Sequence, residues 1–414
     1  MSPSPRYAST ADFESRRFPL HFRKIACFSL VLLAAEARFD SAASPQDAKR
    51  GRAVVGDGAR AGRPERFPHR IWAACDFEGQ TPDYAWFGIV EKTNIPAYPG
   101  NATALRAEPK PYGNVSARMA GMNPVPGPRM GKVNHLYARY FIKGATEAIF
   151  QHFSLTTEDN QHIAVSGLAE SRWAEVTLNF TRDARRNAGS PGSFGDGERM
   201  DDLKVFLGKP GEDKDGKKDR PADEWDLLLD DVIFFAEDPA LPPEPEPFPS
   251  RVILLAAFDT GMTKAERPKY YPGDFEPVTE GLPADSYWGA ARAVPQKEGR
   301  AGKGIRLQIE PPRPVGARTK LRFRYHMQGG SAMTVQIFDL TAGDNRHIRL
   351  RDLRQKEWTT IYLDFTRDSK RNDGSSGPFT AGNRVDDLFF FLDGEEGARS
   401  DLLIDEVVLF DAGK

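Results

Sequence analysis

The chain repeats itself, and this repeat limits its fold more than any other feature of the sequence. Residues 139–207 align without a gap to residues 324–392 at an offset of 185, and 31 of the 69 aligned positions are identical. The match resumes at Asp230 and Asp405 with an offset of 175, so the first copy carries ten extra residues within 209–226. A chain of 414 residues is long enough for two such copies, each with its own core.

The spacing of apolar residues within the repeat predicts an all-β fold. Leu321, Phe323 and Tyr325 alternate with polar residues, which is the period of a strand with one buried face. Residues 388–392 and 402–410 are almost continuously apolar, and we expect both strands to be covered on two faces. Helical periodicity is almost absent. We therefore predict two tandem antiparallel β-sandwich domains, each made of two packed sheets.

The N-terminal residues indicate export. An apolar run at 25–35 follows a basic stretch and ends at Ala35-Glu36-Ala37, which is the order of a cleaved signal peptide, placed here at 1–37. The run is too short to cross roughly 30 Å of hydrocarbon as a helix, so we expect no stable membrane span. Residues 38–70 lack periodicity and predict a disordered spacer. The expected location is secreted, periplasmic or at the cell surface.

A proline-rich segment separates the two copies. Six prolines alternate with acidic residues between Glu237 and Arg251, which favours an extended, stiff linker at 238–250. The predicted domains are therefore 71–237 and 251–414.

Composition excludes two classes of protein. Residues 71–414 carry 44 Lys and Arg against 52 Asp and Glu, so the body is mildly acidic and lacks the clustered cations of a nucleic-acid surface. The two cysteines are Cys27, inside the predicted signal peptide, and Cys75. The mature chain therefore has no intramolecular disulfide, and we expect Cys75 to be a small core residue.

The layout of each copy resembles that of β-jelly-roll carbohydrate-binding modules, which belong to the galactose-binding-like sandwiches. The resemblance rests on the opening motifs Asp-Phe-Glu-Gly at 76–79 and Phe-Asp-Thr-Gly at 258–261, a late Trp strand, and closing strands with Leu-Asp-Asp-Val or Ile-Asp-Glu-Val. It covers both predicted domains. The resemblance implies a jelly-roll fold and a polysaccharide or cell-surface glycan as the partner.

The same resemblance implies a structural calcium ion shared by the first and last strands of each module. The matching residues are Glu78, Asp230, Asp259 and Asp405. Ca²⁺ takes six to eight oxygen ligands, and carboxylates at the ends of neighbouring strands are able to supply the charged ones. The alternative is that these carboxylates cap strands or pair with arginine.

Candidate sugar-binding residues lie in the early loops of each copy, because a sugar needs an aromatic face for its C–H patch and polar groups for its hydroxyls. They are Tyr84, Trp86, Tyr270, Tyr271, Tyr287 and Trp288. The alternative is that each ring closes one end of the sandwich.

Two arginines complete the candidate set. Arg139 and Arg324 point away from the core by strand alternation, and Gln151 with Gln336 are expected to flank them on a neighbouring strand. The result is either a polar concave face or an ordinary solvated one.

No catalytic signature is present, since the sequence lacks a phosphate-binding glycine loop, His-Glu-x-x-His and Gly-x-Ser-x-Gly. The leading hypothesis is an exported, non-catalytic polysaccharide-binding protein. The alternative, from another class, is a structural or adhesive cell-surface protein whose modules contact other proteins.

Overall fold

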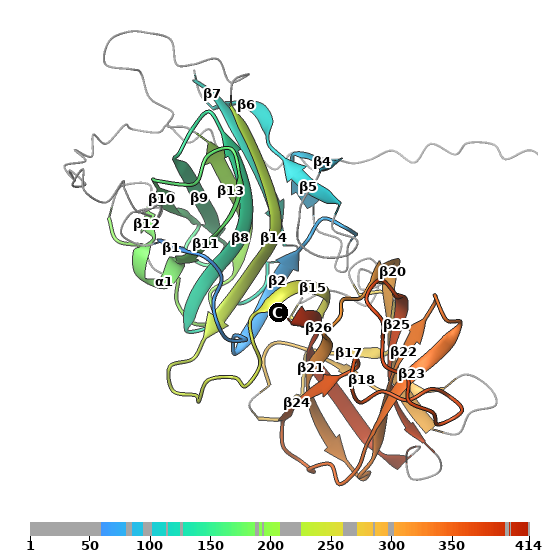
Figure 1. Cartoon of the computed structure of the whole chain (residues 1–414). Helices are drawn as coiled ribbons and strands as arrows, with labels where there is room; N and C mark the ends of the chain where they lie inside the picture. The colour runs from blue at the N-terminus through green and yellow to red at the C-terminus, as the bar shows by residue number, and fades with distance from the viewer. Residues whose placement is uncertain are drawn as a thin grey trace, which may run out of the picture. The chain divides into compact units, whose positions relative to one another are not determined.

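The computed structural model describes most of the chain from Ala59 onward (Figure 1). The described residues are 59–79, 85–93, 102–112, 115–124, 127–186, 190–192, 194–207, 225–259, 271–284, 286–296, 302–393, 397 and 399–412. The predicted signal peptide, Tyr84 and Tyr270 lie outside them. Within these ranges no helix is long and apolar enough to cross a membrane.

Among the described residues, the first copy is built from two seven-stranded antiparallel sheets. Sheet 1 has the order β1-β11-β8-β14-β5-β4, with β2 also paired to β14; its strands are Ala59–Ala61, Trp173–Asn179, Val133–Lys143, Asp226–Glu237, Thr103–Arg106, Ile89–Lys92 and Arg70–Cys75. Sheet 2 has the order β12-β10-β9-β13-β7-β3, with β6 paired to β7; its strands are Arg185–Arg186, Asp159–Val165, Ala148–Ser154, Met200–Leu207, Val115–Asn123, Ala85–Phe87 and Glu108–Tyr112. A short helix, α1 (Phe180–Asp183), follows β11.

The second copy repeats this plan with two six-stranded antiparallel sheets. Sheet 3 has the order β17-β18-β26-β21-β24, with β15 paired to β26; its strands are Glu276–Val278, Ala290–Arg292, Asp401–Ala412, Thr319–Gln328, Thr359–Asp364 and Pro249–Ala256. Sheet 4 has the order β16-β20-β25-β22-β23, with β19 paired to β20; its strands are Gly273–Asp274, Gly302–Pro314, Arg384–Asp393, Met333–Asp339, Asp344–Leu350 and Val294–Pro295. The all-β sandwich prediction is confirmed.

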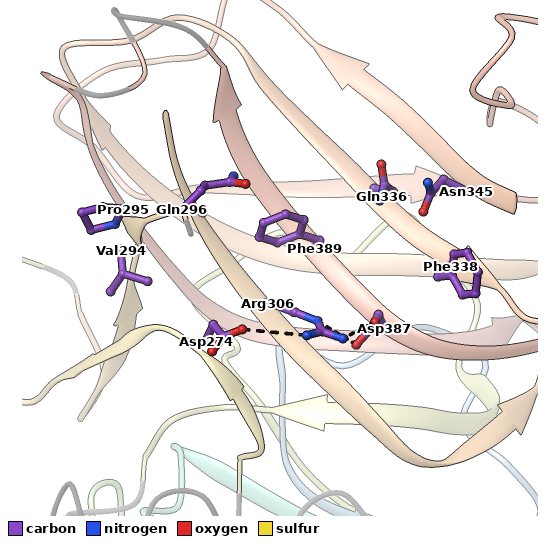
Figure 2. A pocket seen from close by; sticks show the side chains of 11 residues that line it. Asp274, Val294, Pro295, Gln296, Arg306, Gln336, Phe338, Asn345, Asp387 and Phe389 are labelled. Atoms are coloured by element: carbon purple, nitrogen blue, oxygen red, sulfur yellow. Dashed lines mark hydrogen bonds and ion pairs between the residues drawn. The ribbon is translucent and has the colours of Figure 1, made fainter. Parts of the chain in front are cut away.

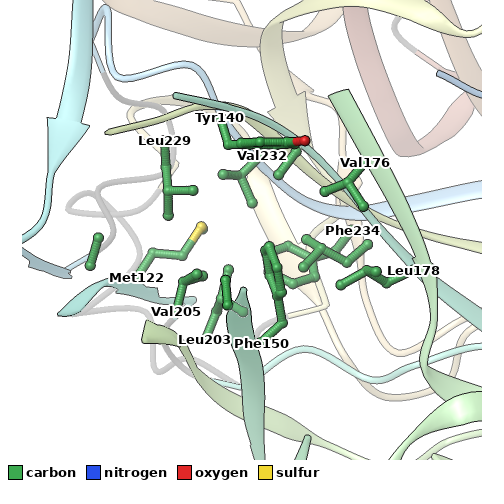
Figure 3. Packing of buried hydrophobic residues seen from close by; sticks show 14 of the residues in the cluster. Met122, Tyr140, Phe150, Val176, Leu178, Leu203, Val205, Leu229, Val232 and Phe234 are labelled. Carbon is green, nitrogen blue, oxygen red and sulfur yellow. The ribbon is translucent and has the colours of Figure 1, made fainter. Parts of the chain in front are cut away.

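Each copy has its own core between its two sheets. In the first copy the inward residues of β8, β9, β11, β13 and β14 form one buried cluster, in which Tyr140, Phe150 and Phe234 are prominent (Figure 3). Cys75 is buried in this cluster, as expected from the sequence. The second copy has an equivalent cluster around Phe323, Tyr325 and Phe390.

The closing strands β14 and β26 are buried on both faces. In β26 every residue from Leu402 to Ala412 is buried, as the continuous apolar run predicts. Leu409 faces the core of the second copy, whereas Val408 and Phe410 belong to a further cluster that takes Phe67 and Phe235 from the first copy. The described residues all belong to one compact unit of the chain, Ser41–Lys414.

The other apolar run, in β25, is not covered on both faces. Leu388, Phe390 and Leu392 are buried in the core, but Phe389 and Phe391 on the opposite face are only half-buried. The prediction for this strand is therefore wrong, because Phe389 and Phe391 line two separate surface cavities rather than a second core.

Two segments expected to be spacers are held by contacts. Residues 59–70 fall in the predicted disordered spacer, but they form β1 and bury Phe67 at 1% exposure. In the proline-rich segment Glu246 forms an ion pair with Lys320, with Nζ 2.6 Å from Oε2, and the Phe248 amide donates to the carbonyl of Glu65. A hydrophobic anchor in each segment, Phe67 and Phe248, explains the difference from a solvated strut.

Candidate functional site

A cavity of about 460 Å³ opens on the outer face of sheet 4, in the second copy. Strands β16, β19, β20, β22, β23 and β25 supply most of its lining (Figure 2). The lining residues are Asp274, Val294, Pro295, Gln296, Gly304, Arg306, Gln336, Phe338, Asn345, Asp387 and Phe389. We call this surface the cavity face.

An ion-paired arginine lies at the base of the cavity face. Arg306 on β20 makes a two-pronged contact with Asp387 on β25, with Nε 3.0 Å from Oδ1 and Nη2 2.6 Å from Oδ2. Asp274 approaches from the other side, 3.8 Å from Nη1 (Figure 2). The hydrogen bond to Asp387 raises the pKa of Arg306, which therefore stays charged. A guanidinium has five N–H donors and each carboxylate oxygen accepts more than one hydrogen bond, so an Arg–Asp pair is able to contact a polar ligand as well.

Phe389 forms an aromatic platform beside this ion pair. It pairs directly with Arg306 across the β20–β25 ladder and is half-buried. The platform depends on Gly304, because a Cβ built there would lie 2.5 Å from Cε2 of Phe389. Phe391 continues the aromatic surface, with its ring centroid 5.3 Å from that of Phe389.

Amide side chains complete the cavity face. Gln336 on β22, Asn345 on β23 and Gln296 after β19 are all half-buried and line the cavity. Each amide offers both donors and an acceptor. An aromatic ring beside amides and a paired arginine matches the two needs of a sugar, which are cover for its C–H face and partners for its hydroxyls.

The same face of the first copy is different. Phe389 aligns with Lys204, and Arg306 aligns in the sheet register with Gly121. Lys204 forms an ion pair with Asp202 at 2.7 Å, and its Nζ lies 5.5 Å from the ring centroid of Phe87. The two copies share a fold but present different chemistry on this face.

In the first copy the amides that align with Gln336 and Asn345 are Gln151 and Asn160. Gln151 donates to Asn160 Oδ1 at 3.0 Å, so two of the groups that align with the cavity face are bonded to each other.

The predicted loop aromatics do not line the cavity. Trp86 on β3 packs against the first core, with its ring centroid 4.7 Å from that of Phe77. Tyr271 is 6% exposed and belongs to the second core, in contact with Phe258. Both side chains therefore contact a sandwich core, and a role for them in sugar binding stays a prediction. Tyr84 and Tyr270 lie outside the described residues.

Tyr287 and Trp288 lie against arginines. The guanidinium carbons of Arg70 and Arg324 are 4.4 and 4.7 Å from the ring centroid of Tyr287. Those of Arg129 and Arg199 are 4.7 and 5.0 Å from a ring centroid of Trp288.

Arg139 and Arg324 lie on the outward side of β8 and β21, as the alternation predicts, but Gln151 and Gln336 do not flank them. β21 is in sheet 3 and β22, which carries Gln336, is in sheet 4. The same separation places Arg139 in sheet 1 and Gln151 in sheet 2. The expectation of a shared face is wrong because the chain crosses from one sheet to the other between these consecutive strands.

The four predicted calcium ligands each have partners within the protein. Glu78 accepts hydrogen bonds from the amides of Ala102 and Thr103. Asp230 pairs with Arg139, Nη1 to Oδ2, at 3.4 Å, and Asp259 pairs with Arg70.

Asp405 is fully buried, and burial together with Glu406 raises its pKa to about 8. Among the described residues no group of three or more His, Cys, Asp or Glu side chains is arranged to hold a metal ion. As arranged here the four carboxylates do not form a calcium cage, and calcium stays a prediction.

Apart from Gln336, sequence reasoning missed the residues of the cavity face. Phe389 was assigned to a buried strand because the run at 388–392 is apolar throughout. The available signal was the comparison of the copies, since Phe389 aligns with Lys204 and a core position does not alternate between phenylalanine and lysine.

No protein-family model matches the sequence, and no curated protein matches it. Among solved structures, the chain is similar to a family 11 carbohydrate-binding module of a cellulosomal cellulase of Clostridium thermocellum, with 13% identity and a TM-score of 0.25; the match covers 34% of this chain and 83% of that one. It is also similar to a Paenibacillus xanthan lyase, with 11% identity and a TM-score of 0.21, over 85% of this chain and 27% of the lyase. The chain therefore spans about a quarter of that second protein. At these scores any function has to be argued from the cavity face itself.

Proposed function

We propose that this chain binds a polysaccharide or cell-surface glycan through the cavity face of its second copy and does not cleave it. The observation that carries this proposal is the cavity of about 460 Å³ in which Phe389 lies beside the Arg306–Asp387 ion pair. The volume lies within the range typical of small-ligand sites.

The chemistry of the lining favours an uncharged sugar. Arg306 is already paired with Asp387 and approached by Asp274, so the cavity has no unbalanced cation to attract an anion. The remaining polar groups, Gln296, Gln336 and Asn345, are neutral amides. Such a lining replaces the water around hydroxyl groups without desolvating a second charge.

The same geometry supports binding without catalysis. Glycoside hydrolysis needs one carboxyl group that donates a proton and a second that acts as base or nucleophile. Each carboxylate oxygen of Asp387 accepts a hydrogen bond from Arg306, so this carboxyl group is engaged within the protein rather than directed at a glycosidic bond.

The test is affinity electrophoresis of the full chain over a panel of neutral and charged glycans, repeated with Phe389→Ala. Covering about 50 Å² of the phenylalanine ring contributes roughly 1.3 kcal/mol, which is close to tenfold in affinity. We expect at least one neutral glycan to retard the wild-type chain and Phe389→Ala to weaken that retardation about tenfold.

The first copy supplies the matched control. Lys204→Ala changes the aligned position on a face of different chemistry, and its retardation should equal that of the wild type. A panel in which no glycan retards the chain, or equal effects of the two variants, would overturn the proposal.

Two further parts of the proposal rest on the sequence. Export is proposed from the order of basic, apolar and Ala-x-Ala segments in residues 1–37. A stabilising calcium ion is proposed from the resemblance to carbohydrate-binding modules. We expect calcium to raise the melting temperature relative to chelator, as measured by thermal melting, and an unchanged midpoint would remove the metal from the proposal.

A further inference from the structure

Both copies carry the same arrangement of an arginine beside a tryptophan on the outer face of a sheet. In the first copy Cζ of Arg139 lies 5.9 Å from the ring centroid of Trp173, and in the second Cζ of Arg324 lies 5.1 Å from that of Trp358. These residues align in the repeat. We call each pair an Arg–Trp shelf.

The surroundings of the two shelves are also repeated. Phe141 contacts Trp173, and the aligned His326 contacts Trp358. The hydroxyl of Tyr140 accepts a hydrogen bond from the amide of Ala169 at 3.0 Å, and the aligned tyrosine of the second copy accepts one from the aligned amide at 2.9 Å. The two shelves therefore lie at structurally equivalent positions in the two copies.

In the second copy the shelf is covered by a peptide segment of the chain itself. The ring of Tyr287 lies over Arg324, 4.7 Å from Cζ. The indole Nε1 of Trp358 donates a hydrogen bond to Ser286 Oγ at 2.9 Å. Ser286 thus contacts the tryptophan of this shelf, and the next residue, Tyr287, contacts its arginine.

In the first copy the shelf opens on a cavity. The cavity has a volume of about 830 Å³, and Arg139, Tyr140, Arg172, Trp173 and Glu175 contribute to its lining. Residues of the first shelf therefore line a cavity, whereas in the second copy the ring of Tyr287 lies over the aligned arginine.

The rim of this cavity is basic. Arg172 is exposed, and it aligns with Glu357 of the second copy. Arg60 is also exposed and has only a 4.0 Å contact with Glu65. Glu175 is bonded to Arg63 at 3.0 Å, so it does not offset these cations. An acidic ligand is favoured at such a rim.

We propose that the Arg–Trp shelf of the first copy binds an acidic peptide segment of a protein partner, with a tyrosine ring stacked on Arg139 and a neighbouring hydroxyl bonded to Trp173. The occupant of the second shelf defines this ligand, because a tyrosine on a guanidinium and a serine on an indole N–H are the contacts made there. Arginine stacks well on aromatic faces, and an acidic flank complements Arg172. This site is separate from the cavity face and does not depend on glycan binding.

The probe is a fluorescent peptide with the sequence of residues 282–289, Leu-Pro-Ala-Asp-Ser-Tyr-Trp-Gly, titrated with the full chain and followed by anisotropy. We expect saturable binding that Trp173→Ala and Arg172→Glu each weaken at least tenfold. A peptide with Tyr287→Ala should bind correspondingly weakly. Arg172→Glu changes an exposed side chain, so it tests the site even if Trp173→Ala fails to fold.

Two matched variants make the result specific. Trp358→Phe alters the shelf that already carries Tyr287, and Phe389→Ala alters the cavity face; both should leave peptide affinity unchanged. Absence of binding, or binding that neither Trp173→Ala nor Arg172→Glu weakens, would overturn the proposal. Displacement of the peptide by a glycan retained on the chain would assign the shelf to sugar and would also overturn it.

Discussion

His152 is a buried imidazole surrounded by aromatic rings. Its ring lies 4.4 Å from that of Phe180 and 5.1 Å from that of Phe234, and its side chain is 1% exposed. Burial lowers the pKa of His152 to about 3. His152 therefore stays neutral in the folded protein at pH values where the histidine of the unfolded chain, with a pKa near 6.5, is protonated.

This burial predicts an acid-sensitive fold. Between pH 6.5 and the lowered pKa of His152 in the folded state, the unfolded state binds more protons, so the free energy of unfolding falls as pH falls. At pH 5 this loss amounts to about 2 kcal/mol. His152→Ile introduces the residue found at the aligned position 337 and should remove that part of the pH dependence. Urea unfolding at pH 7 and pH 5 measures the change in free energy of unfolding between the two pH values. An equal change in the variant and the wild type would contradict the role given to His152.

Trp86 tests the difference between a core residue and a binding residue. Because it packs on Phe77 and the first core, Trp86→Ala should lower the free energy of unfolding by about 2 kcal/mol, below the range for fully buried tryptophan. Glycan retardation of the folded variant should be unchanged. If Trp86→Ala loses glycan retardation while its free energy of unfolding is unchanged, Trp86 is a sugar-binding residue.

At the scale of elements, the central feature is the contact between β20 and β25. Gly304 leaves room for the Phe389 ring, and the aligned residue of the first copy is Met119, where Lys204 replaces the phenylalanine. A glycine in the middle of a strand thus marks the platform.

The close contact at Gly304 predicts a variant that weakens glycan binding and leaves the fold intact. Gly304→Ala should displace the Phe389 ring and weaken glycan binding severalfold, while the fold is retained because the displaced atoms belong to a half-buried side chain. Affinity electrophoresis and thermal melting of the same sample measure both effects. Unchanged glycan affinity would show that the ring position does not matter.

Strand patterns explain how much of the fold was predictable. Alternation identified β21, and the continuous run identified β26, because both patterns report burial directly. The run in β25 was misleading, since a strand with half-buried aromatic residues on its outer face has the same composition as a core strand. The contacts of Tyr287 and Trp288 were not predictable, because their arginine partners are far away in the sequence.

At the scale of the molecule, duplication has produced two copies with a common core and different surfaces. The two copies share core residues such as Tyr140 and Tyr325, while Phe389 and Arg306 belong to one copy. We therefore propose one glycan site per chain, on the cavity face of the second copy.

Calorimetric titration of the full chain with an oligosaccharide of the best-retained glycan tests this proposal most directly. The measurement gives both affinity and the number of sites. We predict one site per chain, weakened about tenfold by Phe389→Ala and unaffected by Lys204→Ala. Two equal sites per chain, or an affinity that is indifferent to Phe389, would contradict the proposal.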